Sequence, residues 1–529
     1  MTTAKKTSSA KKRPAANAGS AGRLLPKPGC VTVRLYRVGH GDCFLLAFPP
    51  STGPLDQPVY VLIDCGYKPG SSSFLDTTAK DIVDDIRAAT GGRIDVVVVT
   101  HEHQDHVNGF TEANFQGIHF GECWFAWTED PDDDFAERLR KRFGDRLQQL
   151  QRARLALAAA GSDQTKRLDE FLAFELGGAS GPANGVALAA TAPGQSANKR
   201  AMKLVRAQAQ DRCRYLVPHT EAQSLPRAPQ VRVFPLGPPK DEALLHSLNP
   251  VGDERFPERT FAPASVNGHF AAALGALPAD ATPDPQAWEG LTPFAKHYAV
   301  ALGEPVLNTD GSNFSALHYG SGPAALRQPA HQHEVADDAP WRRIDGDWLR
   351  SAEELALAMN KDTNNGSLVL AFELGAGGKV LLFAADAQRG NWISWPRGDW
   401  RDGSRTVTAR DLLARTVLYK VGHHGSHNAT LHGQADAAHP NLDWMGRDTH
   451  AAEFTAMITA VEAWAKDQDG WHHPLPAIKK ALLDKARGRV FQTDTALQDM
   501  QKNVPRTEWE AFLARADGTR LYLDYTVEF

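Results

Sequence analysis

The chain has 529 residues, 42% hydrophobic and 23% charged, which is the composition of a globular protein long enough for more than one core. This excludes a fibre, a disulfide-rich miniprotein and a disordered tail. No stretch reaches the roughly 18 consecutive apolar residues of a membrane span, and the first residues lack the apolar segment of a secretion signal. The five cysteines form no CxxC pair, so we predict neither a cysteine-ligated zinc ribbon nor a disulfide framework, and a cytoplasmic location.

The net charge of −5 is unevenly distributed along the chain. Residues 1–29 contain seven basic and no acidic residues, so the remainder carries −12. This excludes a uniformly basic body for binding nucleic acid. We predict that residues 1–29 form a disordered basic tail, because Ala, Ser, Gly and Pro bury too little apolar surface to order it. Weak contact of this tail with phosphate or an acidic surface is the alternative.

The first half of the core is predicted to span residues 30–128. Alternating and continuous apolar runs predict strands at 31–35, 43–48 and 60–63, an amphipathic helix at 77–89, and a strand buried on both faces at 94–99. Hairpin strands, a helix and then a buried strand indicate a layered α/β fold.

The character of the chain changes between residues 129 and 360. Charged amphipathic helices at 131–175 and a strand at 231–234 give way to a long stretch rich in Pro, Ala and Asp. Such long loops rarely lack all structure, so we predict an insertion or lid subdomain with one or two core strands. Residues 361–529 form the second half of the core, with strands predicted at 367–372, 379–383, 417–421 and 520–525.

Three histidines and one aspartate follow the buried strand within six residues: His101, His103, Asp105 and His106. A loop leaving a strand end can turn these side chains toward one point, and imidazole with carboxylate is a ligand set for zinc, iron or manganese. The spacing predicts one ion on His101 and His103 and a second on Asp105 and His106. A solvated polar loop is the alternative.

This His-x-His-x-Asp-His motif resembles the signature of the metallo-β-lactamase fold superfamily of dinuclear hydrolases. Three further residues match that pattern in order: Asp64 as the aspartate that supports the metal loop, Asp386 as the bridging aspartate, and His423 as the last histidine ligand. The resemblance implies a metallo-β-lactamase-like αββα sandwich, with two mixed sheets, outer helices and here a long insertion. It also implies two divalent ions, Zn or Mn.

A narrower resemblance is to the soluble hydrolase domain of the ComEC competence proteins, over about 30–125 and 361–495. It rests on the segments Val38-Gly39-His40-Gly41-Asp42, Asn364-Asn365-Gly366-Ser367 and His423-His424-Gly425-Ser426. ComEC-like domains have the Asn-Asn segment in place of a third-motif histidine. The resemblance therefore implies that the first ion has His101, His103 and Asp386, with water or Asn364 and Asn365 beside them. The membrane channel of those proteins has no counterpart here, so DNA uptake does not transfer.

Two ions close together lower the pKa of a shared water and clamp the oxygens of a displacement. We predict that the resulting metal-bound hydroxide is the nucleophile and that Asp105 orients it. His424, Ser426 and His427 are predicted either to contact a phosphate and protonate a leaving group or to fix His423 by hydrogen bonds.

Three functions remain open. The first is a phosphodiesterase or nuclease acting on phosphate esters, nucleic acids among them; the second is a hydrolase of a small ester, thioester or lactone. The third is a non-catalytic metal-binding module whose insertion binds a protein partner. No membrane partner is predicted, and the sequence leaves the oligomeric state open. Trp392, Trp395 and Trp400 are either a platform for stacking bases or core packing.

Overall fold

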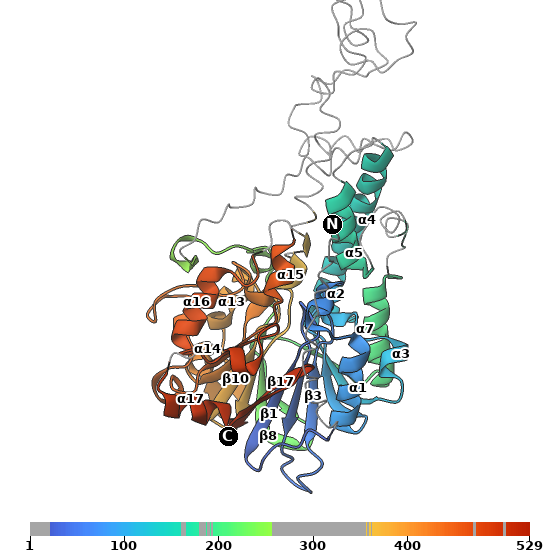
Figure 1. The fold of residues 1–529 in the computed structure, drawn as a ribbon. Helices are drawn as coiled ribbons and strands as arrows, with labels where there is room; N and C mark the ends of the chain where they lie inside the picture. The colour runs from blue at the N-terminus through green and yellow to red at the C-terminus, as the bar shows by residue number, and fades with distance from the viewer. Residues whose placement is uncertain are drawn as a thin grey trace, which may run out of the picture.

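The structure is a computed structural model, and it describes residues 22–159, 165–178, 187, 191, 194–256, 356, 359–360, 362–468, 472–500 and 504–529. It is a mixed α/β protein with two large mixed sheets and helices on their outer faces (Figure 1). The predicted α/β class is confirmed. Among the described residues, no helix combines the length and apolarity needed to cross a membrane.

The first sheet has eight strands and combines the two ends of the chain. In spatial order they are β16 (Ala516–Gly518), β17 (Tyr522–Glu528), β1 (Cys30–Tyr36), β2 (Phe44–Phe48), β3 (Val59–Ile63), β4 (Arg93–Val98), β5 (His119–Ala126) and β6 (Cys213–Leu216). Strands β3 to β6 are parallel and the others antiparallel. A disulfide between Cys123 and Cys213 joins β5 to β6, a link that the cysteine spacing did not predict.

The second sheet has seven strands. In spatial order they are β15 (Val490–Gln492), β14 (Thr455–Ile458), β13 (Thr416–Lys420), β10 (Lys379–Phe383), β9 (Val369–Leu374), β8 (Ala228–Gly237) and β7 (Gln223–Leu225). Strands β10, β13, β14 and β15 run parallel, whereas β9 is antiparallel to both of its neighbours. A separate pair, β11 (Trp400–Asp402) and β12 (Arg405–Val407), forms a small hairpin.

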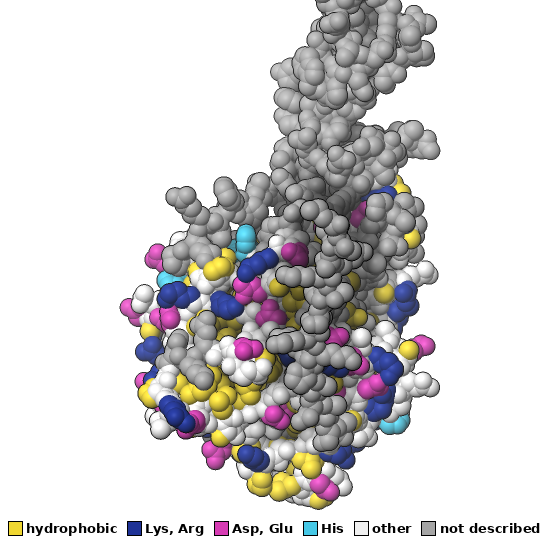
Figure 2. Space-filling view, viewed as in Figure 1, with side chains coloured by type: hydrophobic (Ala, Val, Ile, Leu, Met, Phe, Trp, Pro, Cys, Tyr) yellow, Lys and Arg dark blue, Asp and Glu magenta, His cyan; other side chains and the backbone are white. Residues whose placement is uncertain are grey.

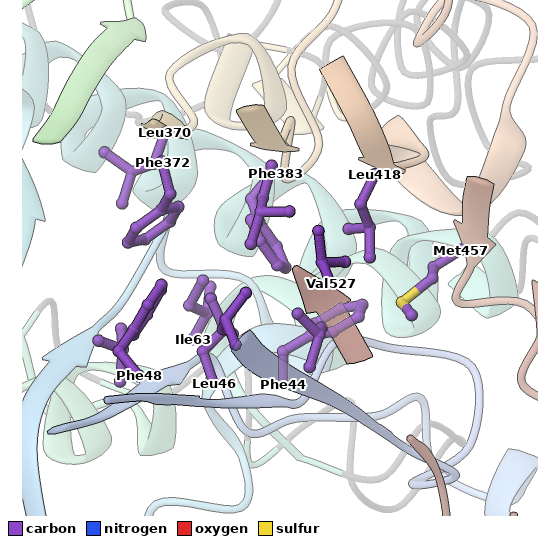
Figure 3. Packing of buried hydrophobic residues seen from close by; sticks show 14 of the residues in the cluster. Phe44, Leu46, Phe48, Ile63, Leu370, Phe372, Phe383, Leu418, Met457 and Val527 are labelled. Carbon is purple, nitrogen blue, oxygen red and sulfur yellow. The ribbon is translucent and has the colours of Figure 1, made fainter. Parts of the chain in front are cut away.

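The two sheets pack face to face over a common apolar core (Figure 3). Phe44 and Phe48 of the first sheet meet Phe383 and Phe372 of the second, with ring centroids 5.3 and 5.9 Å apart. Burying each such side chain contributes about 1.5–3 kcal/mol. The parallel strands that carry the site are therefore held rigidly against one another.

Helices cover both outer faces of this sandwich (Figure 1). On the first sheet lie α1 (Ala79–Thr90) and α7 (Ala197–Gln208), with the short α2 (Gln104–Val107) and α3 (Glu112–Phe115) nearby. Helix α1 begins at the capping box of Thr78 and Asp81 and ends at Gly91, close to the predicted limits of 77–89. The second sheet carries α8 (Glu242–Leu245), α13 (Arg389–Ser394), α14 (Ala409–Ala414) and α16 (Pro476–Lys485). Helix α15 (Glu462–Lys466) packs beside Leu75, and α17 (Arg506–Leu513) contributes to the core between the sheets.

The predicted insertion contains both added helices and core strands. Helices α4 (Asp134–Ala159) and α5 (Thr165–Leu176) pack together and project beyond the sandwich next to α2 (Figure 1). A buried ion pair joins them, with Arg154 Nε 2.7 Å from Asp169 Oδ1. Three strands of the region, β6, β7 and β8, belong to the two sheets, more than the one or two predicted. Residues 257–355 lie outside the described residues.

The start of the described chain differs from the predicted tail. The tail was expected to extend to residue 29, but Leu24 is buried and its backbone N–H donates to Ala89 O at 2.9 Å. Its apolar side chain packs beside α1, so the ordered chain begins before Cys30. Residues 1–21 of the predicted tail lie outside the described residues.

Basic and acidic side chains alternate over the visible face of the molecule (Figure 2). Lysine and arginine are interspersed with aspartate and glutamate there, which agrees with the exclusion of a uniformly basic body.

Candidate metal centre

The candidate site lies where parallel strands of both sheets end. Strand β3 leads into Asp64 and β4 into the histidine motif, while β10 leads into Asp386 and β13 into the segment 423–427. Parallel strands bring their carboxyl ends to one edge of a sheet, and ligands of α/β proteins bind outside that edge. The packing of the two sheets thus brings together residues that are far apart in the sequence.

Four buried residues form the centre of this cluster: Asp105, His106, Asp386 and His424. Each offers one ligand atom, and these atoms lie within 4.8 Å of one another. His106 Nε2 is 3.3 Å from Asp386 Oδ2, and His424 Nε2 is 3.1 Å from Asp105 Oδ2. A second candidate group, Asp42, Asp64 and His106, overlaps the first.

Asp64 lies behind this cluster and orients it. Its Oδ1 accepts a hydrogen bond from Thr100 N at 2.8 Å, and its Oδ2 accepts from Thr100 Oγ1 at 2.7 Å and His106 Nδ1 at 2.8 Å. Because His106 donates from Nδ1, its Nε2 carries the lone pair and faces Asp386. Asp64 thus supports the loop from outside the four-residue group.

The sequence prediction made His423 the last ligand and His424 a candidate catalytic group; in the structure His424 belongs to the four-residue group, and both residues place Nε2 3.8 Å from Asp386 Oδ2. Both residues have left-handed backbone angles, with φ of 39° and 53°, in the turn Gly422–Gly425. The turn directs His424 into the cluster, where its Nδ1 donates to Thr459 O at 2.9 Å. His423 lies at the edge, with Nε2 3.8 Å from Asp386 Oδ2 and 3.3 Å from Asn364 Nδ2.

The first two histidines of the motif, His101 and His103, are arranged differently from Asp105 and His106. We call them the first-ion half of the site, after the ion that the sequence predicts there. His101 Nε2 lies 3.0 Å from His103 Nδ1 and 3.9 Å from Asp386 Oδ2. Ser367 Oγ is 3.2 Å from His101 Nδ1, which links this ring to the strand β9 side of the site. His103 Nε2 lies 3.0 Å from Glu175 Oε1 on α5. Neither His101 nor His103 belongs to the candidate metal groups found among the described residues.

The remaining predicted residues surround the cluster rather than line it. Asn365 donates from Nδ2 to Leu244 O and Leu245 O, both at 2.8 Å, and thereby ties α8 to the core. Asn364 contacts His423, as described above. His427 Nε2 lies 3.3 Å from Asn249 Oδ1, away from the four-residue group, and Ser426 Oγ is 3.5 Å from His427 Nδ1.

The three tryptophans are core residues. Trp392, Trp395 and Trp400 are fully buried, and the rings of Trp392 and Trp395 stack with centroids 4.4 Å apart. Trp400 Nε1 donates to Pro235 O at 2.8 Å. A platform for stacking bases needs exposed rings, so these residues pack the fold instead.

His40, from the segment 38–42 that follows β1, is fully buried beside the site. Its ring centroid is 4.4 Å from that of His424 and 5.4 Å from that of His473. Val461 N donates to His40 Nδ1 at 3.3 Å. His40 therefore belongs to an imidazole cluster that backs His424.

Two lysines near the cluster were not singled out from the sequence. Lys420 is buried at the end of β13, with Nζ 2.5 Å from Asp42 Oδ2 and 3.7 Å from Asp386 Oδ1. Lys68 Nζ is 3.6 Å from Asp105 Oδ2, and burial lowers the pKa of Lys68 to about 8. A charged residue ending the otherwise apolar strand 417–421 was a signal for Lys420. No signal distinguished Lys68 from surface lysines.

Opposing charges shift the pKa values of the central groups. Burial alone would lower the pKa of His106, but the carboxylates of Asp386, Asp64 and Asp42 raise it well above the usual range. Burial would raise the pKa of Asp105, but Lys68 and His424 hold it well below the usual range. The carboxylates around His106 therefore favour a positive charge at this point of the centre.

The residues present fit a divalent cation. His106 and His424 each donate from Nδ1, so their Nε2 lone pairs face carboxylate oxygens of Asp386 and Asp105. Within the described residues, Asp105 Oδ1, His106 Nε2 and both oxygens of Asp386 are buried without a hydrogen-bond partner. Facing acceptors are costly unless a positive charge lies between them, and imidazole with carboxylate suits zinc or manganese.

Comparison of the chain with known proteins identifies no family. No family model matches the chain, and a search of curated proteins finds no match either. Function is therefore inferred from the site itself and from the motifs.

Proposed function

We propose that this chain is a metal-dependent hydrolase with a metallo-β-lactamase fold, and that it cleaves phosphate esters as a phosphodiesterase or nuclease. The fold assignment is supported by two mixed sheets packed face to face, with helices outside them and the motif residues at strand ends. The order of Asp64, the histidine motif, Asp386 and the His-His segment along the chain agrees with it.

One observation carries the proposal: the Nε2 atoms of His106 and His424 face buried carboxylates, and among the described residues His106 Nε2, Asp105 Oδ1 and both oxygens of Asp386 have no hydrogen-bond partner. In this proposal Asp105, His106, Asp386 and His424 hold one divalent ion, and His101 and His103 hold a second together with Asp386. When bound, such ions lower the pKa of a water and stabilise negative charge on the oxygens of a displacement.

The chain's own residues orient the reactants. Asp105 Oδ1 has no hydrogen-bond partner among the described residues and can accept a hydrogen bond from an attacking water, which orients that water. His424 donates to Thr459 O from Nδ1 and turns Nε2 toward Asp105, so a role as ligand suits it better than that of a general acid. His423 lies nearer the rim, with its side chain 18% exposed, where it can meet the leaving group.

Lys68 favours a phosphate ester over a neutral ester as substrate. Its ammonium group lies 3.6 Å from Asp105 Oδ2, next to the proposed ions, and its side chain is 11% exposed. A cation there can bind a non-bridging phosphate oxygen, whereas the carbonyl of a neutral ester carries no charge to pair with it.

The test is metal analysis of the purified full chain, followed by hydrolysis assays with and without added Mn²⁺ or Zn²⁺. We expect metal-dependent cleavage of bis-aryl phosphates or oligonucleotides. Cleavage of thioesters or lactones alone would replace the proposal with the small-ester hydrolase. Two bound ions without hydrolysis of any substrate would favour the non-catalytic module.

A Lys68→Met variant sharpens this assay. We expect it to lose more activity on a phosphodiester than on any neutral ester that the wild type also cleaves. Lys80→Met is the matched control, because Lys80 is an exposed lysine on α1. An equal loss on both substrates would remove Lys68 from the argument for phosphate.

A further inference from the structure

The inserted helix α5 reaches the first-ion half of the site. Glu175, one residue before the end of α5, is 5% exposed and places Oε1 3.0 Å from His103 Nε2. The neighbouring Phe174 packs on the His103 ring, with centroids 4.3 Å apart. A helix outside the two sheets therefore contributes a buried carboxylate to a residue of the motif.

The two ring nitrogens of His103 face different partners. Nε2 faces Glu175, and Nδ1 faces His101 Nε2 at 3.0 Å. A carboxylate accepts only, so Nε2 carries the proton and Nδ1 presents its lone pair toward His101. Both imidazoles of the first-ion half can thus offer a lone pair to one point.

Asp64 does the same for His106 in the other half of the site. There the carboxylate accepts from Nδ1 at 2.8 Å and leaves Nε2 to face the centre. A carboxylate that holds the remote nitrogen of a ligand fixes the tautomer and the ring orientation and raises the basicity of the ligand nitrogen. Glu175 and Asp64 are therefore equivalent devices, one carried by the insertion and one by a core strand end.

The end of α5 is anchored firmly enough to position a side chain. Asn198 Nδ2 on α7 donates to Phe174 O at 2.9 Å and to Glu175 O at 3.0 Å. Gln104 Nε2, within the metal motif, donates to Gly178 O at 2.9 Å. These contacts hold the Glu175 backbone from two sides.

We propose that Glu175 is a positioning residue for the first ion: it fixes His103 with Nδ1 toward the metal, so that binding of this ion depends on the inserted helices. The inference rests on the proposed dinuclear site. By this inference the insertion helps to complete the metal site, in addition to any contact that it makes with a protein partner. Glu175 lies beyond the far nitrogen of His103 relative to His101, and so acts through that ring.

The test is stepwise metal binding to the full chain after chelation, followed by calorimetry and by the visible absorption of Co²⁺. For Glu175→Ala we expect the first-half ion to bind about 10- to 100-fold more weakly, with the affinity of the other ion unchanged. Glu175→Gln keeps an acceptor oxygen and should retain most of the affinity. Glu170→Gln, at an exposed position of the same helix, is the matched control.

Glu175→Asp covers the case in which the alanine variant does not fold. It keeps the charge but withdraws the carboxylate by one methylene, so we expect weaker binding of the first-half ion here too. Wild-type affinity for both ions in the alanine or aspartate variant would overturn the proposal. Glutamine as damaging as alanine would overturn it as well, because it would make Glu175 a direct ligand.

The failure of this inference can be told from failure of the proposed function. A wild type that binds two ions and cleaves phosphodiesters, together with silent Glu175 variants, refutes only the role of Glu175. A wild type that binds no ion refutes both.

Discussion

The two halves of the site are built in different ways. The half around Asp105, His106, Asp386 and His424 is assembled entirely from segments that follow strands of the two sheets. The half around His101 and His103 takes its outer support from Ser367, at the start of β9, and from Glu175 on an added helix. Packing of the two sheets is enough to assemble the half around Asp105 and His106. The half around His101 and His103 also requires the added helix α5, which lies outside the sheets.

This difference shows that neighbouring residues of one motif can be positioned by different parts of the fold, the core and the insertion. His103 and Asp105 are two residues apart, yet one is held by the insertion and the other by core groups. Substitutions in the core should therefore affect the two proposed ions differently from substitutions in the insertion.

The largest effect is expected from Asp105→Asn, which removes a carboxylate from the half built by the sheets. We expect turnover to fall by about 1000-fold or more, roughly 4 kcal/mol in the barrier, while the circular dichroism spectrum stays unchanged. Steady-state kinetics on the best phosphodiester checks this. The control is Asp84→Asn on the exposed face of α1, and undiminished turnover in Asp105→Asn would exclude Asp105 from the reaction.

Asp169→Ala should affect the insertion and leave the core intact. It removes the partner of the buried Arg154, and breaking such a pair costs about 3 kcal/mol. Hydrogen exchange should show lost protection in α4 and α5 with β4 and β10 unchanged, and the first-half ion should bind more weakly. The control is Glu170→Ala, and loss of protection throughout both sheets would contradict the division between core and insertion.

Asp64→Ala should weaken the other half selectively. It removes the acceptor of His106 Nδ1 and so releases the ring from its tautomer, which costs about 10- to 100-fold in metal affinity. Stepwise metal titration checks this. Asp95→Ala is a fitting control, because Asp95 is also buried but lies near the opposite end of β4, where its Oδ2 accepts from Tyr60 N. Equal weakening of both ions would mean that the halves are not independent.

The smallest effect is expected outside both halves, at Glu462 on α15. Burial would raise the pKa of Glu462, but hydrogen bonds from Lys479 and Lys466 lower it to about 2. A lowered folded-state pKa stabilises the protein above pH 4.5, and that contribution is lost as the pH falls toward 2. Glu462 is one-third exposed, so Glu462→Gln should cost less than about 1 kcal/mol at pH 7.

Urea unfolding at pH 7 and pH 3 checks this last prediction, and the difference between wild type and Glu462→Gln should shrink at the lower pH. A difference that grows on acidification would contradict the sign. Metal content should be the same in both proteins, since Glu462 lies outside both halves.

The sequence predicted the parts of the site that follow from local patterns. Asp105 and His106 lie in a motif directly after a buried strand, and Asp386 follows the strand at 379–383, so their convergence at one sheet edge follows from the α/β arrangement. The membership of His424 in the four-residue group was not predictable, because the direction of its side chain depends on the left-handed backbone of His423 and His424.

Contacts between distant segments were equally out of reach. Glu175 follows His103 by 72 positions and lies in a charged helical segment, in which nothing marks one glutamate from another. The burial of Trp392, Trp395 and Trp400 depends on tertiary packing and was likewise not predictable, because aromatic residues interleaved with arginines are compatible with a surface as well as with a core.

The pairing of β1 with β17 has a consequence for how the chain folds. Arg34 on β1 binds Asp524 on β17 across 490 residues, with Nε 2.8 Å from Oδ1, and the two strands are neighbours throughout. During synthesis, β1 must wait with one edge unpaired until residues 522–528 leave the ribosome. Closing so long a loop is slow, and an open edge invites pairing with other chains. Nascent chains of this protein should therefore depend on chaperones more than their finished fold suggests.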